Sequence, residues 1–308
     1  MKVLVTGGAG FIGSHVVDRL LNRGIDVRIY DLVQPYTEEN VEYYHASLLD
    51  LEKMKMAMKG IDAVFHLGAV ADVKDVLEDP HDSEEINVRG TINILEAARK
   101  MGVKRVIYGS TVWVYSDTKS ITGVVDESTP LTAPSHLYTA TKLAGEYYCK
   151  SYSELYDLDY TILRYGVPYG PRARGGAVVP IFVKKALNGE PLTIAGDGMQ
   201  FRKFVYVEDL AEGNVLALKD IAKNKTYNLE GDENVTIKQI AETVQKIIGK
   251  VEIKFVEGRK GDFSGNEISA RLALDELSWK PATSFEEGVR KYIEWYRELQ
   301  ESKKKIVI

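Results

Sequence analysis

The apolar positions of this chain fall into short runs, separated by longer stretches in which apolar residues recur every three or four positions. The runs, which predict strands, lie at 2–6, 25–30, 41–45, 61–67, 103–109, 160–165 and 226–229. The helical patterns lie at 11–23, 51–59, 82–101, 136–156 and 207–219. Strands that alternate with helices predict an α/β fold with a doubly wound parallel sheet, covered by helices on both faces. Ligands of such sheets bind at the carboxyl ends of the strands.

The first predicted strand leads directly into a glycine turn, Gly7-Gly8-Ala9-Gly10, and a helix begins at Phe11. Because glycine has no Cβ, a pyrophosphate can approach this main chain, where free N–H groups and the positive end of the helix dipole favour an anion. Asp31 ends the next strand, eighteen residues after Gly13. A carboxylate there can accept both hydroxyls of an adenosine ribose and would repel a 2′-phosphate. The pattern predicts a Rossmann-type sheet that binds a dinucleotide, and it favours NAD over NADP.

Glycine and proline become frequent after residue 166, which indicates a change of architecture. Such breaks occur at Gly170-Pro171, Gly175-Gly176, Gly189-Glu190-Pro191 and Gly196-Asp197-Gly198. The run at 226–229 still resembles a strand of the first sheet. We therefore expect an NAD-binding domain over 1–165, to which 205–229 returns. A smaller, discontinuous α/β substrate domain is expected mostly from 166–308.

Composition excludes several classes of protein. The 308 residues, 44% of them hydrophobic, suffice for a large core, and a net charge of −5 gives no reason to expect nucleic acid as a partner. The single cysteine, Cys149, excludes an internal disulfide framework, and the five histidines lack ligand spacing, so we expect no metal. Without a leader-like N-terminus or an apolar run long enough to span a bilayer, we expect a soluble cytoplasmic protein with no membrane partner.

Tyr138 and Lys142 are four residues apart in a predicted helix, which places them on one face, a turn apart. A neighbouring ammonium favours the phenolate, as would a positive nicotinamide ring, so such a tyrosine can act as a base near neutral pH. The same spacing also occurs in a half-buried Tyr beside an exposed Lys. The position of the pair after the fifth strand, behind a dinucleotide turn, favours the catalytic interpretation.

Polar residues follow three of the predicted strands, and we expect them to converge on one cleft. These are the loop after Leu67, Ser110-Thr111, and the stretch from Arg164 to Arg174. The Thr111 hydroxyl can bond the substrate oxygen that Tyr138 deprotonates, or it can simply cap the end of a strand. The nearby Tyr-Lys pair favours the first interpretation.

Together these motifs resemble the extended short-chain dehydrogenase/reductases of the nucleotide-sugar epimerase/dehydratase group, and most of all UDP-glucose 4-epimerase within it. The matching segments span nearly the whole chain. They are TGGAGFIG at 6–13, Asp31, DAVFHLGA at 62–69, NVRGT at 87–91, GSTVWVY at 109–115, YTATK at 138–142, LRYGVPYGPR at 163–172, GDGMQFRKFVYVEDLA at 196–211 and RKGD at 259–262.

The resemblance implies roles for the residues at matching positions. Tyr138 would be the general base, Lys142 its partner and Thr111 the third catalytic residue. The implied NAD contacts are Gly7, Gly10, Phe11, Ile12, Gly13, Asp31, Leu32, Leu48, Leu67, Gly68, Ala69, Ser110, Tyr138, Lys142 and Gly166. The implied substrate contacts are Thr111, Tyr138, Val167, Arg172, Val178, Arg202, Arg259, Asp262 and Asn266, with the diphosphate on Arg202 and Arg259 and the uridine ribose on Asp262.

The implied reaction inverts the configuration at carbon 4 of a nucleotide sugar. It proceeds by transfer of a proton and a hydride. Tyr138 takes the 4-hydroxyl proton while NAD⁺ takes the hydride, the flat 4-keto sugar rotates, and the hydride returns to the other face. Val112-Trp113 stand where related dehydratases carry an Asp-Glu pair and decarboxylases a Glu, which disfavours those reactions. A nucleotide-sugar oxidoreductase or dehydratase and a non-catalytic NAD-binding sensor remain as alternatives.

Departures from the family pattern leave the sugar open. The usual diphosphate-binding Asn is Val167, and Asn266 stands where a Tyr often limits the size of the sugar. Arg172 and Arg174 could meet a sugar carboxylate or lie in a solvated turn. A UDP-linked hexose, N-acetylhexosamine or uronic acid therefore remains open.

Members of the family often dimerise through two helices of each subunit, so the resemblance implies a homodimer. The corresponding helices here are those over 82–101 and 136–156. Their candidate apolar face comprises Ala97, Ala98, Tyr147, Tyr148 and Tyr152, although the same residues could pack on the sheet.

Overall fold

The computed structural model describes residues 1–37, 41–118, 123–257 and 267–306. The chain divides into two compact units. Unit 1 comprises Met1–Gly166, Leu210–Leu229 and Asn266–Lys280, and unit 2 comprises Val167–Asp209, Glu230–Gly265 and Pro281–Ile308. The return to unit 1 thus begins at residue 210 rather than 205, and the segment 266–280 joins unit 1 as well.

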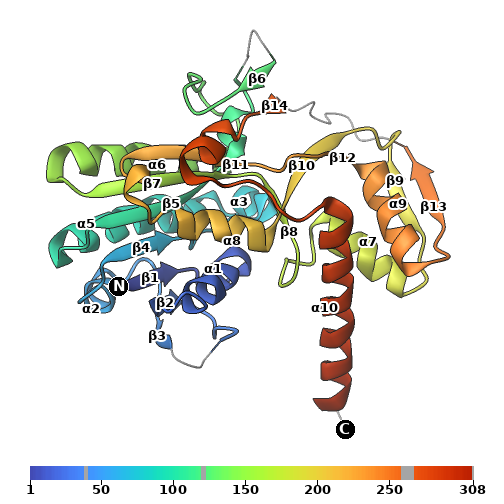
Figure 1. The fold of residues 1–308 in the computed structure, drawn as a ribbon, viewed down its shortest axis with the longest axis horizontal. Coiled ribbons are helices and arrows are strands. Elements are labelled where there is room, and N and C mark those ends of the chain that lie inside the picture. The colour runs from blue at the N-terminus through green and yellow to red at the C-terminus, as the bar shows by residue number, and fades with distance from the viewer. Residues whose placement is uncertain (38–40, 119–122, 258–266, 307–308) are drawn as a thin grey trace. The chain divides into compact units, whose positions relative to one another are not determined.

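A parallel sheet of seven strands forms the centre of unit 1, in the order β11-β7-β5-β4-β1-β2-β3 (Figure 1). Its strands are β1 (Lys2–Thr6), β2 (Asp26–Asp31), β3 (Val41–His45), β4 (Ala63–His66), β5 (Arg105–Thr111), β7 (Asp159–Tyr165) and β11 (Lys225–Leu229). Each predicted run overlaps one of these strands, and the doubly wound Rossmann-type fold is confirmed. The strand order reverses between β1 and β4, where sheets of this kind bind their ligands.

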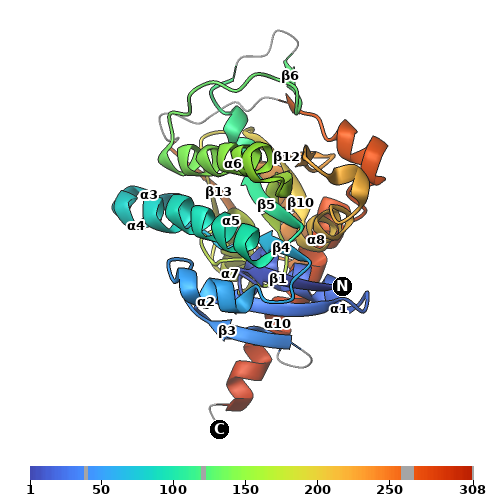
Figure 2. The same ribbon diagram turned by 90° about the vertical axis from the view of Figure 1, so that its left-hand side faces the viewer.

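Helices cover both faces of this sheet (Figure 2). One face carries α2 (Leu51–Ala57), α5 (Gly90–Met101) and α6 (Leu137–Tyr156), and the other carries α1 (Phe11–Leu21) and the part of α8 (Val207–Leu216) that belongs to unit 1. The helix predicted at 82–101 is interrupted. It consists of α4 (Pro80–Glu84), a single π-helical turn, η1 (Glu85–Arg89), and α5.

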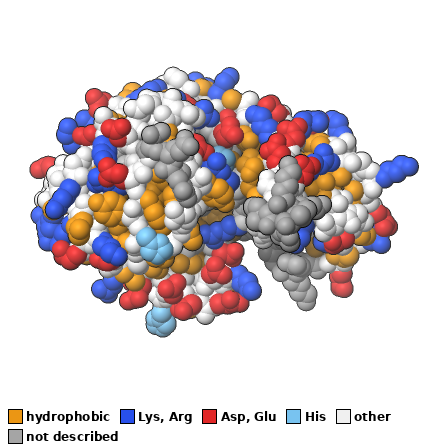
Figure 3. Space-filling model, turned by 90° about the horizontal axis from the view of Figure 1, so that it is seen from below, with side chains coloured by type: hydrophobic (Ala, Val, Ile, Leu, Met, Phe, Trp, Pro, Cys, Tyr) orange, Lys and Arg blue, Asp and Glu red, His pale blue; other side chains and the backbone are white. Residues whose placement is uncertain are grey.

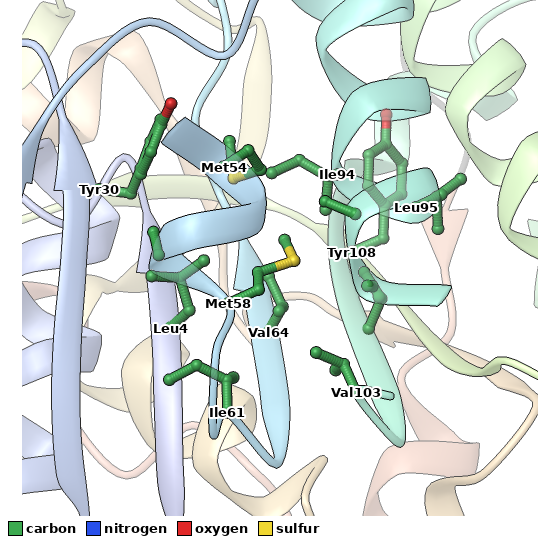
Figure 4. Close-up of a cluster of buried hydrophobic side chains, with 14 of the residues drawn as sticks. Leu4, Tyr30, Met54, Met58, Ile61, Val64, Ile94, Leu95, Val103 and Tyr108 are labelled. Atoms are coloured by element: carbon green, nitrogen blue, oxygen red, sulfur yellow. The ribbon is translucent and has the colours of Figure 1, made fainter. Parts of the chain in front are cut away.

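The strands of unit 1 are apolar on both sides because both sides are buried. Leu4, Tyr30, Val64 and Tyr108 face the layer formed by α2 and α5, and none is more than 1% exposed (Figure 4). Ala97 and Ala98 lie fully buried in the same core. Of the two alternatives left open for these alanines, packing on the sheet is the one that the structure shows.

The other elements of unit 1 are short. They are α3 (Val73–Glu78), the 3₁₀ turns η2 (Val112–Tyr115) and η3 (Asp220–Ala222), the π turn η4 (Ala273–Leu277), and the parallel pair β6 (Val124–Val125) and β14 (Glu267–Ile268).

Gly145 allows α6 to lie directly on β5, since a Cβ there would be 2.2 Å from the Tyr108 hydroxyl oxygen.

Unit 2 contains two small sheets, β12-β10-β8 and β13-β9, with helices packed around an aromatic core. Its elements are β8 (Val167–Tyr169), α7 (Val178–Leu187), β9 (Leu192–Ala195), β10 (Phe201–Tyr206), β12 (Asn234–Thr236), α9 (Ile237–Ile248), β13 (Ile253–Val256) and α10 (Phe285–Ile306). Tyr169, Phe204 and Phe285 contact one another at its centre, with ring centroids 5.0–6.0 Å apart.

The surface carries charges of both signs. On the face shown in Figure 3, Lys and Arg side chains are interspersed with Asp and Glu side chains, as expected for a solvated surface. Across the part of the chain that the structure describes, no helix combines the length and apolar character that crossing a bilayer requires.

Candidate active site

The turn after β1 has a shape that requires glycine. Gly7 has a φ of +67°, and a Cβ there would lie 2.6 Å from the backbone nitrogen of Gly68. At Gly13 a Cβ would lie 2.0 Å from the carbonyl oxygen of Gly7. The two glycines therefore let the loop after β4 and the first turn of α1 approach the same stretch of backbone.

The N-terminus of α1 is suited to an anion. Its N-cap is Gly10, so no side chain caps the helix, and its first turn contains no acidic residue. The N-terminal N–H groups, which include those of Phe11 and Ile12, and the positive end of the dipole point to where an anion would bind. This arrangement fits the pyrophosphate of a dinucleotide.

Asp31 is fixed at the end of β2 by backbone hydrogen bonds. One carboxylate oxygen accepts from the N–H of Ala9 at 2.9 Å, and the other from Leu32 at 2.7 Å and Val33 at 3.2 Å. A carboxylate has about four acceptor positions, so acceptor capacity remains for a ribose hydroxyl. The adjoining Leu32 side chain is 56% exposed and accessible to a ligand.

The loop Leu67-Gly68-Ala69 is held from below by a buried histidine. His66 bonds Thr6 through Nδ1 and Thr91 through Nε2, both at 2.9 Å, and the Gly68 N–H donates to the Thr6 hydroxyl. Burial, with the nearby Lys142 charge, lowers the pKa of His66 to about 3, so the ring stays neutral. His66 thus has a structural role beneath the loop.

Leu48 supports the same loop. Its side chain is 8% exposed, and its Cδ1 lies 3.3 Å from where a Cβ on Gly68 would be. It also packs closely on Gly90, at the start of α5. Leu48 therefore fixes the position of the loop from the side of α5.

Lys142 lies on α6 with its side chain directed at β5. The residue is 5% exposed, Nζ donates to the carbonyl oxygen of Gly109 at 2.9 Å, and Nζ lies 5.2 Å from the centre of the Tyr108 ring. Burial lowers the pKa of the ammonium to about 8, opposed by Cys149 and Glu146. Because the site is poorly hydrated, this charge acts strongly on neighbouring groups.

Tyr138 lies one turn before Lys142, in the first turn of α6, and is half-buried. Its N–H donates to Nδ1 of His136, the N-cap of this 20-residue helix, at 3.2 Å. The positive end of the helix dipole favours a negative charge at this position, in addition to the effect of Lys142. The predicted placement of the Tyr-Lys pair on one helix face agrees with the structure.

Thr111 ends β5 and is 7% exposed. Its Oγ1 accepts the N–H of Trp113 at 3.2 Å, so its own proton remains to be donated. The helix α6 packs along β5, which brings the end of this strand to the side of the helix that carries Lys142.

A buried ion pair lies behind these residues, and the sequence analysis missed it. Glu146 accepts two hydrogen bonds from Arg164, at 2.9 and 2.7 Å, and one from the Ser110 hydroxyl at 2.6 Å. None of the three residues is more than 2% exposed. Glu146 follows Lys142 by one helical turn on the buried face, and that spacing was the available signal.

This pair revises two expectations. The Ser110 hydroxyl proton is committed to Glu146, which leaves only the oxygen as an acceptor for a cofactor. Arg164 is directed into the interior of unit 1 rather than into a cleft. Gly166 ends unit 1 as a buried residue whose N–H donates to the carbonyl of Leu229 at 2.9 Å.

Four of the predicted substrate residues that the structure describes belong to unit 2. Val167 begins β8 and is paired with Phe204, and Val178 is the first residue of α7, whose N-cap offers no side-chain hydrogen bond. Arg172 is half-buried with a φ of +65°, a strained conformation for a residue with a side chain. Arg202 on β10 is half-buried, and its guanidinium donates to its neighbour's carbonyl at 2.7 Å.

Arg259, Asp262 and Asn266 lie outside the described residues. The convergence of residues from both units on one cleft stays a prediction. Among the residues that the structure describes, no group of three His, Cys, Asp or Glu side chains is placed to hold a metal ion.

The glycine turn at an uncapped helix, the fixed carboxylate after β2 and the Tyr-Lys pair on α6 define a dinucleotide-binding protein of the short-chain dehydrogenase/reductase type. Residues 3–229 match the model of the NAD dependent epimerase/dehydratase family. The chain belongs to this family, whose cofactor is NAD, and the resemblance drawn from its motifs is confirmed.

Similar proteins cover the chain almost completely. The putative UDP-glucose 4-epimerase of Methanocaldococcus jannaschii is 34% identical over 306 residues, which cover 96% of this chain and 98% of that protein. The UDP-N-acetyl-alpha-D-glucosaminuronate decarboxylase of Bacillus cytotoxicus is 34% identical over 327 residues, covering 97% and 98%. The Thermus thermophilus UDP-glucose 4-epimerase, solved as a complex with NAD, has a TM-score of 0.86 at 35% identity, with 96% and 99% covered.

Proposed function

We propose that this protein is an NAD-dependent 4-epimerase of a UDP-linked sugar. The proposal rests on one observation: Tyr138 and Lys142 occupy the first two turns of α6, beside the end of β5 with Thr111. This pair and the glycine turn belong to the same unit. The similarity to UDP-glucose 4-epimerases supports the reaction class.

Residues of unit 1 would hold the cofactor. The pyrophosphate would bind the N-terminus of α1 and the adenosine ribose would bind Asp31, while Lys142 would hydrogen-bond the nicotinamide ribose. The loop at Gly68 would pass beneath the cofactor, with Leu48 fixing its position. When bound, NAD supplies the acceptor and donor of the hydride at carbon 4.

The catalytic work of the chain itself is to hold and move one proton. Tyr138 would take the proton of the sugar 4-hydroxyl and later return it. Lys142, one helical turn away, and the positive end of the helix dipole would both favour the phenolate form of Tyr138. The Thr111 hydroxyl would donate a hydrogen bond to the same sugar oxygen.

The substrate contacts and the assembly are proposed by analogy with the family. Arg202 would bind the diphosphate, because its planar guanidinium donates in pairs, and Arg172 is proposed beside it. A homodimer would pack on the exposed side of α6, where Tyr147 and Tyr148 are 56% and 37% exposed. Light scattering of the wild type and of a Tyr147→Asp variant tests the dimer.

One alternative has direct support. The similarity to a nucleotide-sugar decarboxylase keeps decarboxylation as a second candidate. Against it, η2 presents Val112 and Trp113 after Thr111, and neither can act as an acid or base. Release of carbon dioxide from a UDP-uronate would identify this reaction, and stoichiometric consumption of added NADH would identify a net oxidoreductase.

The experiment is an assay with UDP-glucose, UDP-N-acetylglucosamine and UDP-glucuronate, followed by NMR. We expect conversion of at least one sugar to its 4-epimer without net NADH consumption. Tyr138→Phe should lower kcat by about 10²–10⁴-fold, the usual contribution of a general base. The matched control is Tyr156→Phe, at the exposed end of the same helix. No conversion, or equal rates for Tyr138→Phe and wild type, would contradict the proposal.

A further inference from the structure

A large aromatic side chain is exposed beside the proposed catalytic residues. Trp113 lies on η2, two residues after Thr111, and is 39% exposed. Its backbone N–H donates to the Thr111 hydroxyl oxygen at 3.2 Å. An indole in water leaves apolar surface unburied, and a ligand bound at the Thr111 hydroxyl would cover part of it.

A second ring is packed against this indole. His136 contacts Trp113 edge-on, with ring centroids 6.0 Å apart and an interplanar angle of 90°. The same His136 accepts the N–H of Tyr138 through Nδ1. Because Nδ1 accepts a hydrogen bond, the ring proton is on Nε2, which gives the ring a donor at its other edge. The backbone of Trp113 is thus bonded to the Thr111 side chain, and the His136 ring is bonded to the backbone of Tyr138.

The segment that carries His136 is also tied to Asp117, two residues after η2. Asp117 accepts the backbone N–H of Ser135 at 2.9 Å and the Ser135 hydroxyl at 3.0 Å. A carboxylate that accepts two bonds from one residue limits the movement of that residue. Trp113 and His136 therefore form a preorganised pair, held at both ends.

We propose that Trp113 and His136 form an aromatic wall against which the pyranose ring of the nucleotide sugar packs. The axial C–H bonds on the two faces of a pyranose are apolar and weakly positive, and the face of an indole is negative. The inference rests on the proposed function. It states that the wall binds the sugar of the substrate and not the nucleotide.

An aromatic contact of this kind suits a sugar that must rotate within its binding site. Epimerisation requires the 4-keto sugar to present each face in turn, and directional hydrogen bonds would favour one orientation. An apolar plane accepts either face of the ring, because its attraction depends mainly on area. The wall would therefore hold the intermediate without fixing its orientation.

The test compares the affinities for UDP-glucose and for UDP, which lacks the sugar, by calorimetry. Trp113→Ala should weaken UDP-glucose binding about three- to tenfold, the usual contribution of an aromatic contact, and leave UDP binding unchanged. Trp113→Phe should retain most of the affinity. His136→Asn keeps a side chain that can cap α6 but removes the ring, and it should show a smaller loss for UDP-glucose alone.

A second measurement uses the wild type and needs no truncation of the wall. UDP-glucose should change the tryptophan fluorescence more than UDP does, and Trp113→Phe should remove that difference. The other two tryptophans are Trp279, which is 2% exposed, and Trp295, which lies in unit 2. Trp295→Phe is the matched control, because it removes one tryptophan and leaves the wall intact. Equal losses for UDP and UDP-glucose in Trp113→Ala, or no loss for either, would overturn the wall. Failure of the wild type to bind any of the three UDP-sugars would instead overturn the proposed function, and the wall with it.

Discussion

Glu230 is a buried carboxyl group whose replacement should stabilise the protein in a pH-dependent way. It follows β11, is 3% exposed, and accepts a hydrogen bond from the N–H of Gly231 at 3.2 Å. Burial raises its pKa from 4.5 to about 8, only partly opposed by Gly231 and the charge of Lys203. The native state therefore keeps the proton over a pH range in which the unfolded chain has lost it.

The magnitude follows from the difference between a pKa of about 8 in the native state and 4.5 in the unfolded chain. At about 1.4 kcal/mol per unit, ionisable Glu230 costs the native state about 5 kcal/mol above pH 8 and about 3 kcal/mol at pH 7. Below pH 4.5 both states are protonated and the cost vanishes. Glu230→Gln, which resembles the neutral acid, should remove the cost.

The assay is urea unfolding of wild type and Glu230→Gln at pH 4.5, 7 and 9. We expect near-equal free energies of unfolding at pH 4.5 and a more stable variant at pH 7 and 9. Glu242→Gln, on the exposed side of α9, is the control and should show no such trend. A difference that does not change with pH, or a variant less stable than wild type at pH 9, would refute the reasoning.

Three further predictions concern the site. Gly13→Ala should weaken NAD binding at least tenfold by calorimetry, because its Cβ would lie 2.0 Å from a carbonyl oxygen; Gly175→Ala, which meets nothing within 4 Å, should not. Glu146→Gln should cost about 3–5 kcal/mol in urea unfolding by leaving Arg164 unpaired, and Glu146→Gln with Arg164→Met should recover part of it. Gly145→Ala should cost about 1–3 kcal/mol in urea unfolding through its clash with the Tyr108 hydroxyl, and Tyr108→Phe should relieve only part of it in the double variant, because the ring Cζ would still lie 2.5 Å from the new Cβ.

The parallel sheet could be predicted from the sequence because its strands are apolar on both faces. Val3 and Val5 face one helical layer and Leu4 the other, and all three are fully buried, so the run at 2–6 is apolar throughout. The strands of unit 2 gave no such signal. β8 and β12 have three residues each, which is too short for a periodicity to be seen.

The parts of the site that are local in sequence were predictable, and those that depend on distant partners were not. The glycine turn and the spacing of Tyr138 and Lys142 are set within a few residues. The hydrogen bond from Ser110 to Glu146 joins residues 36 positions apart, and the ion pair of Arg164 with Glu146 joins residues 18 positions apart. The π turn before α5 is a property of the backbone that the side-chain pattern does not record.

The central claim is that the hydride removed from carbon 4 returns to the same carbon within one active site. The direct measurement uses the 4-deuterated form of the UDP-sugar that the protein converts, with NMR of the epimer after incubation in ordinary water. The account predicts that wild type forms an epimer that retains deuterium at carbon 4. Tyr138→Phe should form almost none of this epimer. An epimer that has exchanged its deuterium for solvent protons would contradict the account.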